Sequence, residues 1–161
     1  MKLNHEEVIQ MLDRADEKAQ RTSRCLKIAV GSAIIKGEPT RIIYGVNTTY
    51  PLNCKKVGCR RFELYGENSK NHRLPSDCRA LHSEIDAITT AARNGHKLKG
   101  AAIVVTRYPC EACARAIVSS GITDVYYGRQ QEISEETKKV FESGGVSVTW
   151  IKNWEREDTI R

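Results

Sequence analysis

The amino-acid sequence predicts an α/β fold in which a mixed five-stranded sheet is covered by helices on both faces. Helical and strand-like segments alternate through the second half of the chain, which favours parallel strands joined by crossover helices. The first two strand-like segments are joined by a tight turn and should pair antiparallel. At 161 residues the chain is long enough for one hydrophobic core and short for two, so we expect residues 1–161 to form a single domain.

The first elements follow from apolar spacing and turn residues. Residues 4–22 carry apolar side chains at helical intervals, with Asn4 as a cap and acidic residues in the first turn. Residues 26–35 and 40–46 are rich in β-branched side chains, and the turn-forming segment 36–39 separates them. We expect a helix followed by a hairpin.

Residues 47–75 show no sustained period and are largely polar, which predicts a long loop. A loop of this length inside a compact domain is usually functional, disordered or held by a ligand. Cys54, Cys59, His72 and Cys78 could provide such a restraint.

The second half of the chain is regular. Glycines follow the predicted helices and mark their ends. The charged tail, residues 151–161, should lie at the surface or at an interface, with Trp150 and Trp154 packing the carboxyl end against the sheet or a partner subunit. We expect helices at residues 79–94, 110–120 and 134–143, and strands at residues 101–106, 124–127 and 146–150.

The composition is typical of a globular protein, with 40% hydrophobic and 29% charged residues. No apolar run approaches the roughly 20 residues that span a bilayer, and the amino end lacks the plan of a signal peptide, so we expect no membrane association and a cytoplasmic location. In a reducing compartment, clustered thiols among the six cysteines favour metal binding or catalysis. The net charge of +6 suits an anionic ligand, although a solvated basic surface explains it equally well.

Four residues carry the predicted chemistry. His82 precedes a predicted helix, and Cys110 and Cys113 lie in the first turn of another, where the helix dipole favours thiolates. One nitrogen and two sulfur ligands suit a zinc ion that keeps a fourth position open for water. Glu84, two residues after His82, points to a different side of the helix start, where it could carry protons to and from that water.

The order H-x-E followed by P-C-x-x-C is the signature of zinc-dependent nucleobase deaminases. With further matching stretches at residues 23–31, 54–59 and 108–127, the chain resembles the deoxycytidylate (dCMP) deaminases of the cytidine and deoxycytidylate deaminase superfamily. The resemblance implies a three-layer α/β/α cytidine-deaminase-like fold and hydrolysis of dCMP to dUMP and ammonia. His82 argues against free-nucleoside cytidine deaminases, which use a cysteine at this position.

The sequence also departs from this family pattern. Ser83 replaces the usual alanine between the histidine and the glutamate, and Asp86 replaces an asparagine. Asn47 keeps the position expected to contact the sugar or base, but Thr48 follows it where the family usually has glycine, which changes the backbone options there.

The resemblance also implies a second, structural zinc ion, with ligands from Cys25, Cys54, His72 and Cys78, and with Cys59 as a competitor. Such a site would tie down the long loop and contribute to folding. Alternatively, Cys25 and Cys59 are buried small apolar residues.

Four side chains are further candidates for substrate binding. Tyr108 could stack on the pyrimidine, although an aromatic residue at a strand end more often packs in the core. Arg24, Lys27 and Arg115 could contact a phosphate, although each could equally be a surface charge.

By resemblance we expect a homo-oligomer, such as a hexamer, and regulation by dCTP and dTTP. The alternative enzyme is a deaminase of single-stranded DNA or tRNA, but an aromatic content of 6% and the lack of a basic stripe interleaved with aromatics disfavour it. A non-enzymatic, zinc-stabilised interaction domain is a third reading, which the intact His82, Glu84, Cys110 and Cys113 disfavour.

Overall fold

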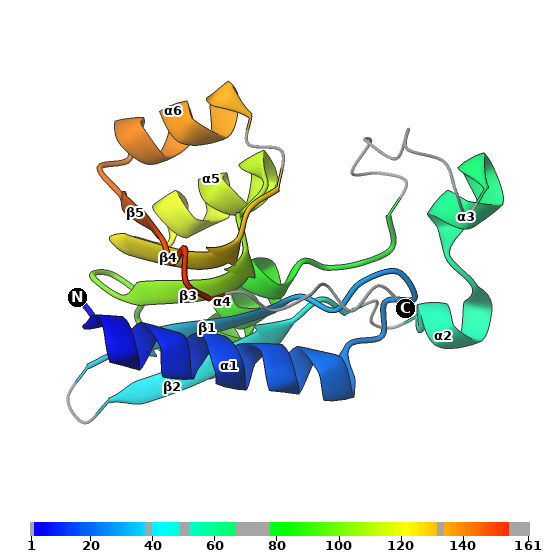
Figure 1. The fold of residues 1–161 in the computed structure, drawn as a ribbon, viewed down its shortest axis with the longest axis horizontal. Coiled ribbons are helices and arrows are strands. Elements are labelled where there is room, and N and C mark those ends of the chain that lie inside the picture. The colour runs from blue at the N-terminus through cyan, green and yellow to red at the C-terminus, as the bar shows by residue number, and fades with distance from the viewer. Residues whose placement is uncertain (1, 38–39, 49–51, 67–77, 132–133, 155–161) are drawn as a thin grey trace.

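The computed structural model of the protein describes residues 2–37, 40–48, 52–66, 78–131 and 134–154. Within these residues, a single sheet lies between helices on its two faces, so the fold has three layers (Figure 1). The predicted three-layer α/β/α architecture is confirmed.

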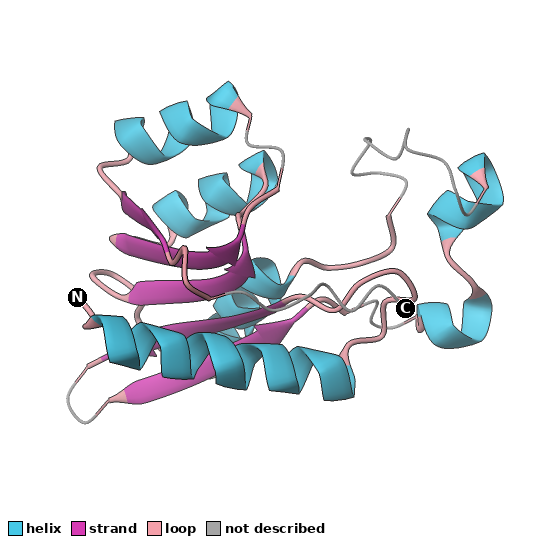
Figure 2. Ribbon diagram, in the orientation of Figure 1, coloured by secondary structure: helices cyan, strands magenta, loops and turns pink. Residues whose placement is uncertain are grey.

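The sheet has five strands in the order β2-β1-β3-β4-β5; they are labelled in Figure 1 and drawn in magenta in Figure 2. β1 pairs antiparallel with β2 and β3, whereas β3, β4 and β5 run parallel to one another. The predicted mixed sheet is therefore present, with the hairpin on one side and the crossover connections on the other. The strands are β1 (Gly31–Lys36), β2 (Arg41–Val46), β3 (Ala102–Arg107), β4 (Asp124–Arg129) and β5 (Ser147–Trp150).

Alternating strand side chains fill two cores, one on each face of the sheet. Ala33 and Ile35 of β1 pack with the apolar face of α1, whereas Ile34 packs with the helices of the opposite layer. The Asn4 side chain accepts from the Glu7 N–H and so caps α1, as the sequence predicted. The layers are α1 (His5–Thr22) on one face, and α4 (Ser83–Arg93), α5 (Glu111–Ser119) and α6 (Glu135–Ser143) on the other.

The prediction that residues 26–35 form one strand is wrong, because β1 begins only at Gly31. The preceding backbone bonds to the Asn47 side chain instead of to a neighbouring strand. Asn47 Nδ2 donates to the Ile28 carbonyl at 2.7 Å, and Asn47 Oδ1 accepts from the Val30 N–H at 2.9 Å. This segment therefore lies outside the sheet, and Lys27, Ile28 and Val30 in it line a cavity.

Two further segments differ from prediction by more than two residues. The segment predicted as loop contains two short helices, α2 (Cys54–Val57) and α3 (Arg60–Tyr65), which stand apart from the sheet (Figure 1). The helix predicted from residue 79 begins at Ser83, because Leu81 forms an isolated bridge with Thr48 and so keeps an extended backbone.

The described part of the carboxyl tail packs against the body of the protein. Ile151 and Trp154 are buried, and Trp154 Nε1 donates to Asp13 of α1 at 2.8 Å. The expected packing of Trp154 is confirmed, whereas residues 155–161 lie outside the described part. None of the described helices is long and apolar enough to span a membrane.

Candidate active site

Two helix N-termini meet at one end of the sheet and carry the two motifs. β3 ends at Arg107, and the chain then turns through Tyr108 and Pro109 to Cys110, the N-cap of α5. His82 is the N-cap of α4 on the same side of the sheet. Neither cap residue uses its side chain to cap its own helix, so both side chains are available to each other.

His82, Cys110 and Cys113 form a compact donor group. His82 Nδ1 lies 3.4 Å from the Sγ atoms of both cysteines. The ligand atoms of the three residues all lie within 4.8 Å of one another, and no other set of three or more histidine, cysteine or acidic side chains in the described ranges converges in this way. One nitrogen and two sulfurs at this spacing fit a tetrahedral zinc ion with one position left for water or substrate.

The three side chains shift one another's pKa values. Hydrogen bonds from Cys113 and His82 lower the pKa of the Cys110 thiol to about 4. The hydrogen bond to Cys110 raises the pKa of His82, while burial and, to a smaller extent, the positive charge of Arg61 oppose that rise. Hydrogen bonding to Cys110 and burial raise the pKa of Cys113. These contacts favour the thiolate form of Cys110, which is the form that binds a metal ion.

Glu84 lies beside this cluster in the first turn of α4, with 4% of its surface exposed. Burial raises the pKa of its carboxyl above the ordinary value. Its Oε2 accepts a hydrogen bond from Ser83 Oγ at 3.1 Å. A buried carboxyl with a raised pKa, next to a metal-type donor group, is suited to exchanging protons near neutral pH.

A cavity of about 240 Å³ opens onto His82, Cys110 and Glu84. Lys27, Arg61 and Arg107 also line it, and Glu84 is the one carboxylate among the lining residues that the structure describes. The cavity wall therefore carries an excess of positive charge, as a site for an anionic molecule would.

Arg61 and Arg107 were missed by the sequence analysis. Arg107 ends β3 directly before the Tyr-Pro-Cys turn, so its place at the functional end of a strand could have identified it. Arg61 lies in α3, outside the sheet, and no local pattern indicates that α3 approaches the cavity.

Asn47 and Lys27 line the cavity, and their contact with substrate stays a prediction. The Asn47 side chain is also part of the protein's internal network, since its Oδ1 accepts from Ser23 Oγ at 2.7 Å in addition to its bonds with residues 28 and 30. Asn47 therefore shapes the wall that carries Lys27, whatever contact it makes with a ligand.

Tyr108 lines the cavity, although only 4% of its surface is exposed. Its ring packs edge-on against Tyr127, with centroids 4.9 Å apart, and against Phe141, with centroids 6.4 Å apart. These contacts match the core-packing alternative. Stacking of Tyr108 on a pyrimidine stays a prediction.

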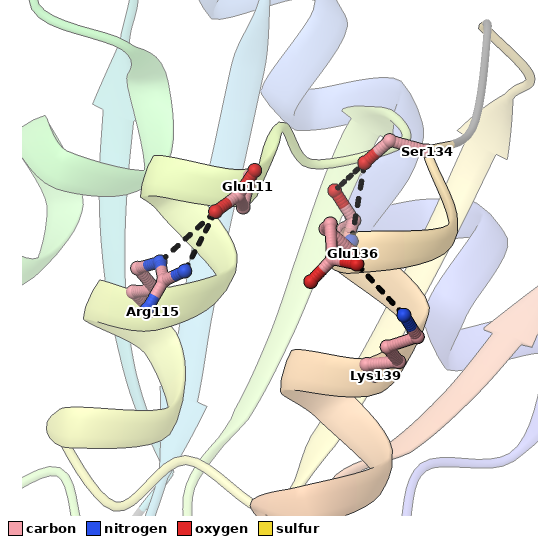
Figure 3. A network of polar contacts seen from close by, with 6 residues as sticks. Glu111, Arg115, Ser134, Glu136 and Lys139 are labelled. Atoms are coloured by element: carbon pink, nitrogen blue, oxygen red, sulfur yellow. Dashed lines mark hydrogen bonds and ion pairs between the residues drawn. The ribbon is translucent and has the colours of Figure 1, made fainter.

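Arg24 and Arg115 are not among the residues that line the cavity. Arg24 is exposed, two residues after the end of α1. Arg115 lies on the outer face of α5, where its guanidinium contacts Glu111 at 2.7 Å, next to the Glu136–Lys139 pair of α6 (Figure 3). The structure does not bring either arginine to the site within this chain.

The remaining cysteines do not form a second converging group in the described part of the chain. Cys25, Cys59 and Cys78 line the cavity, and Cys54 is buried at the start of α2. His72 lies outside the described residues. A second zinc site stays a prediction.

The chain is similar in sequence to known deaminases. The family model of the cytidine and deoxycytidylate deaminase zinc-binding region matches residues 4–129. The chain is 29% identical over 132 residues to ComE operon protein 2 of Bacillus subtilis, an alignment covering 81% of this chain and 64% of that protein. It is 32% identical over 128 residues to the deoxycytidylate deaminase of Saccharomyces cerevisiae, covering 78% of this chain and 39% of that enzyme. The chain thus spans less than two thirds of the length of either relative.

Among solved structures, the dCMP deaminase of cyanophage S-TIM5 in complex with dCMP and dUMP superimposes with a TM-score of 0.64. The match covers 93% of this chain and 100% of the cyanophage chain at 20% sequence identity. At that identity, the superposition shows a shared fold.

Proposed function

Because the chain belongs to the cytidine and deoxycytidylate deaminase family, we propose that it is a zinc-dependent enzyme that hydrolyses dCMP to dUMP and ammonia. The observation that carries the proposal is the approach of His82 Nδ1 to both Cys110 and Cys113 at 3.4 Å, with the buried Glu84 lining the same cavity. The family relationship and the donor geometry support the same chemistry independently.

His82, Cys110 and Cys113 would hold the zinc ion. When bound, zinc lowers the pKa of a coordinated water toward neutrality and so supplies a nucleophile. Cys110 needs little change to act as a ligand, because its neighbours already lower the pKa of its thiol.

Glu84 would move the protons of the reaction. Its carboxylate takes a proton from the attacking water and delivers it to ring nitrogen N3 of cytosine while the oxygen bonds to C4. Glu84 then takes the remaining hydroxyl proton and passes it to the C4 amino group, which leaves as ammonia as the C4–N bond breaks. Burial raises the pKa of the Glu84 carboxyl, so near neutral pH it is protonated more often than an ordinary glutamate and can both accept and return a proton.

A nucleoside monophosphate suits the charge of the cavity. Two thiolates would neutralise zinc, so Lys27, Arg61 and Arg107 face a single carboxylate, Glu84. A phosphate carries about two negative charges at neutral pH and would balance this excess. The name of the yeast relative, deoxycytidylate deaminase, and the dCMP and dUMP bound in the cyanophage structure support deoxycytidylate as the substrate.

The decisive experiment compares ammonia release from dCMP, cytidine and a cytosine-bearing oligonucleotide, with the Glu84→Gln variant as the matched control. We expect dCMP to be preferred, and Glu84→Gln to keep one zinc ion while losing about 10²–10⁴-fold in kcat. Preference for the oligonucleotide would favour the nucleic-acid deaminase alternative, and substantial turnover by Glu84→Gln would refute the proton-shuttle role.

The remaining expectations belong to the same proposal. Repeating the dCMP assay with dCTP and dTTP tests regulation, and light scattering tests for a homo-oligomer such as a hexamer. Metal analysis tests the second zinc ion with ligands from Cys25, Cys54, His72 and Cys78. About one zinc ion per chain, and not two, would contradict that site.

A further inference from the structure

Ser83 lies between the proposed metal ligand His82 and the proposed proton carrier Glu84. It is the first residue of α4 and is 0% exposed. Its hydroxyl donates to Glu84 Oε2 at 3.1 Å. Ser83 also lines the cavity, so this hydrogen bond lies at the site and not behind it.

The backbone of Ser83 is itself fixed. Its carbonyl oxygen accepts a hydrogen bond from Ser32 Oγ of β1 at 2.8 Å, and Ser32 is also 0% exposed. The start of α4 is therefore anchored to the central sheet one residue before Glu84. The backbone position from which the Ser83 hydroxyl reaches Glu84 is therefore fixed.

Glu84 needs such a partner for two reasons. The terminal torsion of a glutamate side chain has a broad energy minimum, so packing around its methylene groups alone does not fix the plane of the carboxylate. A carboxylate removed from water also requires hydrogen-bond donors to offset its lost hydration. A hydroxyl on Oε2 meets both requirements and leaves the second oxygen in a defined direction.

We propose that Ser83 is a positioning residue that orients the Glu84 carboxylate toward the reacting atoms. The proposal rests on the proton-carrying role proposed for Glu84. Serine stands here in place of the alanine that the family resemblance predicts, so this chain has a hydroxyl that an alanine could not supply.

The test compares Ser83→Ala with the matched control Ser32→Ala. Each variant removes one buried hydroxyl and one hydrogen bond at the start of α4, but only Ser83 contacts Glu84. We expect Ser83→Ala to lower kcat for dCMP about tenfold with KM within about twofold and with zinc content unchanged, the size of a lost hydrogen bond to a charged group. Ser32→Ala loosens the backbone anchor but leaves the Ser83 hydroxyl on Glu84, so it should lower kcat clearly less than Ser83→Ala does.

A double-mutant cycle with Glu84→Ala tests the contact without relying on activity. Ser83→Ala should lower the urea midpoint of unfolding in the native background and leave it unchanged in the Glu84→Ala background. Additive midpoints, an unchanged kcat in Ser83→Ala, or equal losses of kcat in Ser83→Ala and Ser32→Ala would each overturn the proposal. Absence of ammonia release by the native enzyme would instead overturn the proposed function, while the cycle still decides whether the contact exists.

Discussion

The two sides of the cavity are built in different ways. The proposed catalytic side, His82, Glu84 and Cys110 with Cys113 next to them, comes from the starts of two helices, α4 and α5, and from two short stretches of sequence. The cationic side comes from three separate segments, with Lys27 before β1, Arg61 in α3 and Arg107 at the end of β3. Residues close together in the sequence form the catalytic side, whereas the cationic side depends on which distant segments pack together.

This difference follows from what each side has to do. Metal coordination tolerates errors of only about 0.2 Å in ligand distance, so rigid helix starts are the natural supports for ligands. Attraction of a phosphate acts over several ångströms and accepts long, flexible cations from different elements. Substitutions on the two sides should therefore separate chemistry from recognition.

The largest effect should come from Cys113→Ser on the catalytic side. Because Cys113 is 1% exposed and serine is of similar size, the fold should persist while a thiolate ligand is lost. We expect loss of bound zinc and at least about a 10³-fold fall in kcat/KM. Metal analysis measures the zinc, circular dichroism checks the fold, and ammonia release measures the activity. A variant with full zinc content and activity would show that the metal is held elsewhere.

Arg107→Gln and Arg61→Gln should have smaller and selective effects. Loss of one charge-assisted hydrogen bond to phosphate should lower kcat/KM for dCMP about 10-fold to 100-fold. Activity toward deoxycytidine, which has no phosphate, should change by less than about twofold, with zinc content unchanged. An equal loss for both substrates would assign these arginines a structural role and remove the contrast between the two sides.

Gly45→Ala tests the packing that supports the catalytic side. A Cβ at Gly45 of β2 would lie 2.5 Å from the Ala87 backbone nitrogen and would also strike the Ser83 carbonyl oxygen, so α4 must move. We expect a loss of about 2–4 kcal/mol in the free energy of unfolding together with weaker zinc binding.

Gly95→Ala is the control for Gly45→Ala. Gly95 follows α4 with φ +70° and has nothing within 4 Å of an added Cβ, so the substitution introduces backbone strain without a clash. It should cost about 1–2 kcal/mol and leave zinc affinity unchanged. Equal effects of the two substitutions on zinc affinity would contradict the support role of the β2–α4 contact.

Arg115→Ala should have the smallest effect. Its side chain is 64% exposed and its ion pair with Glu111, four residues away on α5, is of a type worth only a few tenths of a kcal/mol. We expect kcat/KM for dCMP to stay within about twofold. A tenfold loss would place Arg115 at the site of a neighbouring subunit. The specific activity of the native protein should then fall on dilution, as the subunits separate.

Sequence reasoning succeeded where the signal was local. The capped first helix, the hairpin and the helix–strand alternation each depend on residues within one element, and the structure confirms the sheet that they predict. It failed at residues 26–30, because the backbone groups expected to join the sheet are bound by the Asn47 side chain, about twenty residues later in the chain. A hydrogen bond between residues distant in the sequence produces no periodic pattern of apolar residues, so the local sequence does not reveal it.

The sequence by itself determined the fold class and brought His82, Glu84, Cys110 and Cys113 together as candidates, because helix starts and short motifs are encoded by neighbouring residues. Only the tertiary structure decided which basic residues line the cavity, replacing Arg24 and Arg115 with Arg61 and Arg107. It alone revealed the Ser83–Glu84 hydrogen bond and its anchor on Ser32. The Ser32 anchor arises from the packing of α4 on β1, and the basic wall arises where segments distant in the sequence meet at the cavity, so both depend on the whole fold.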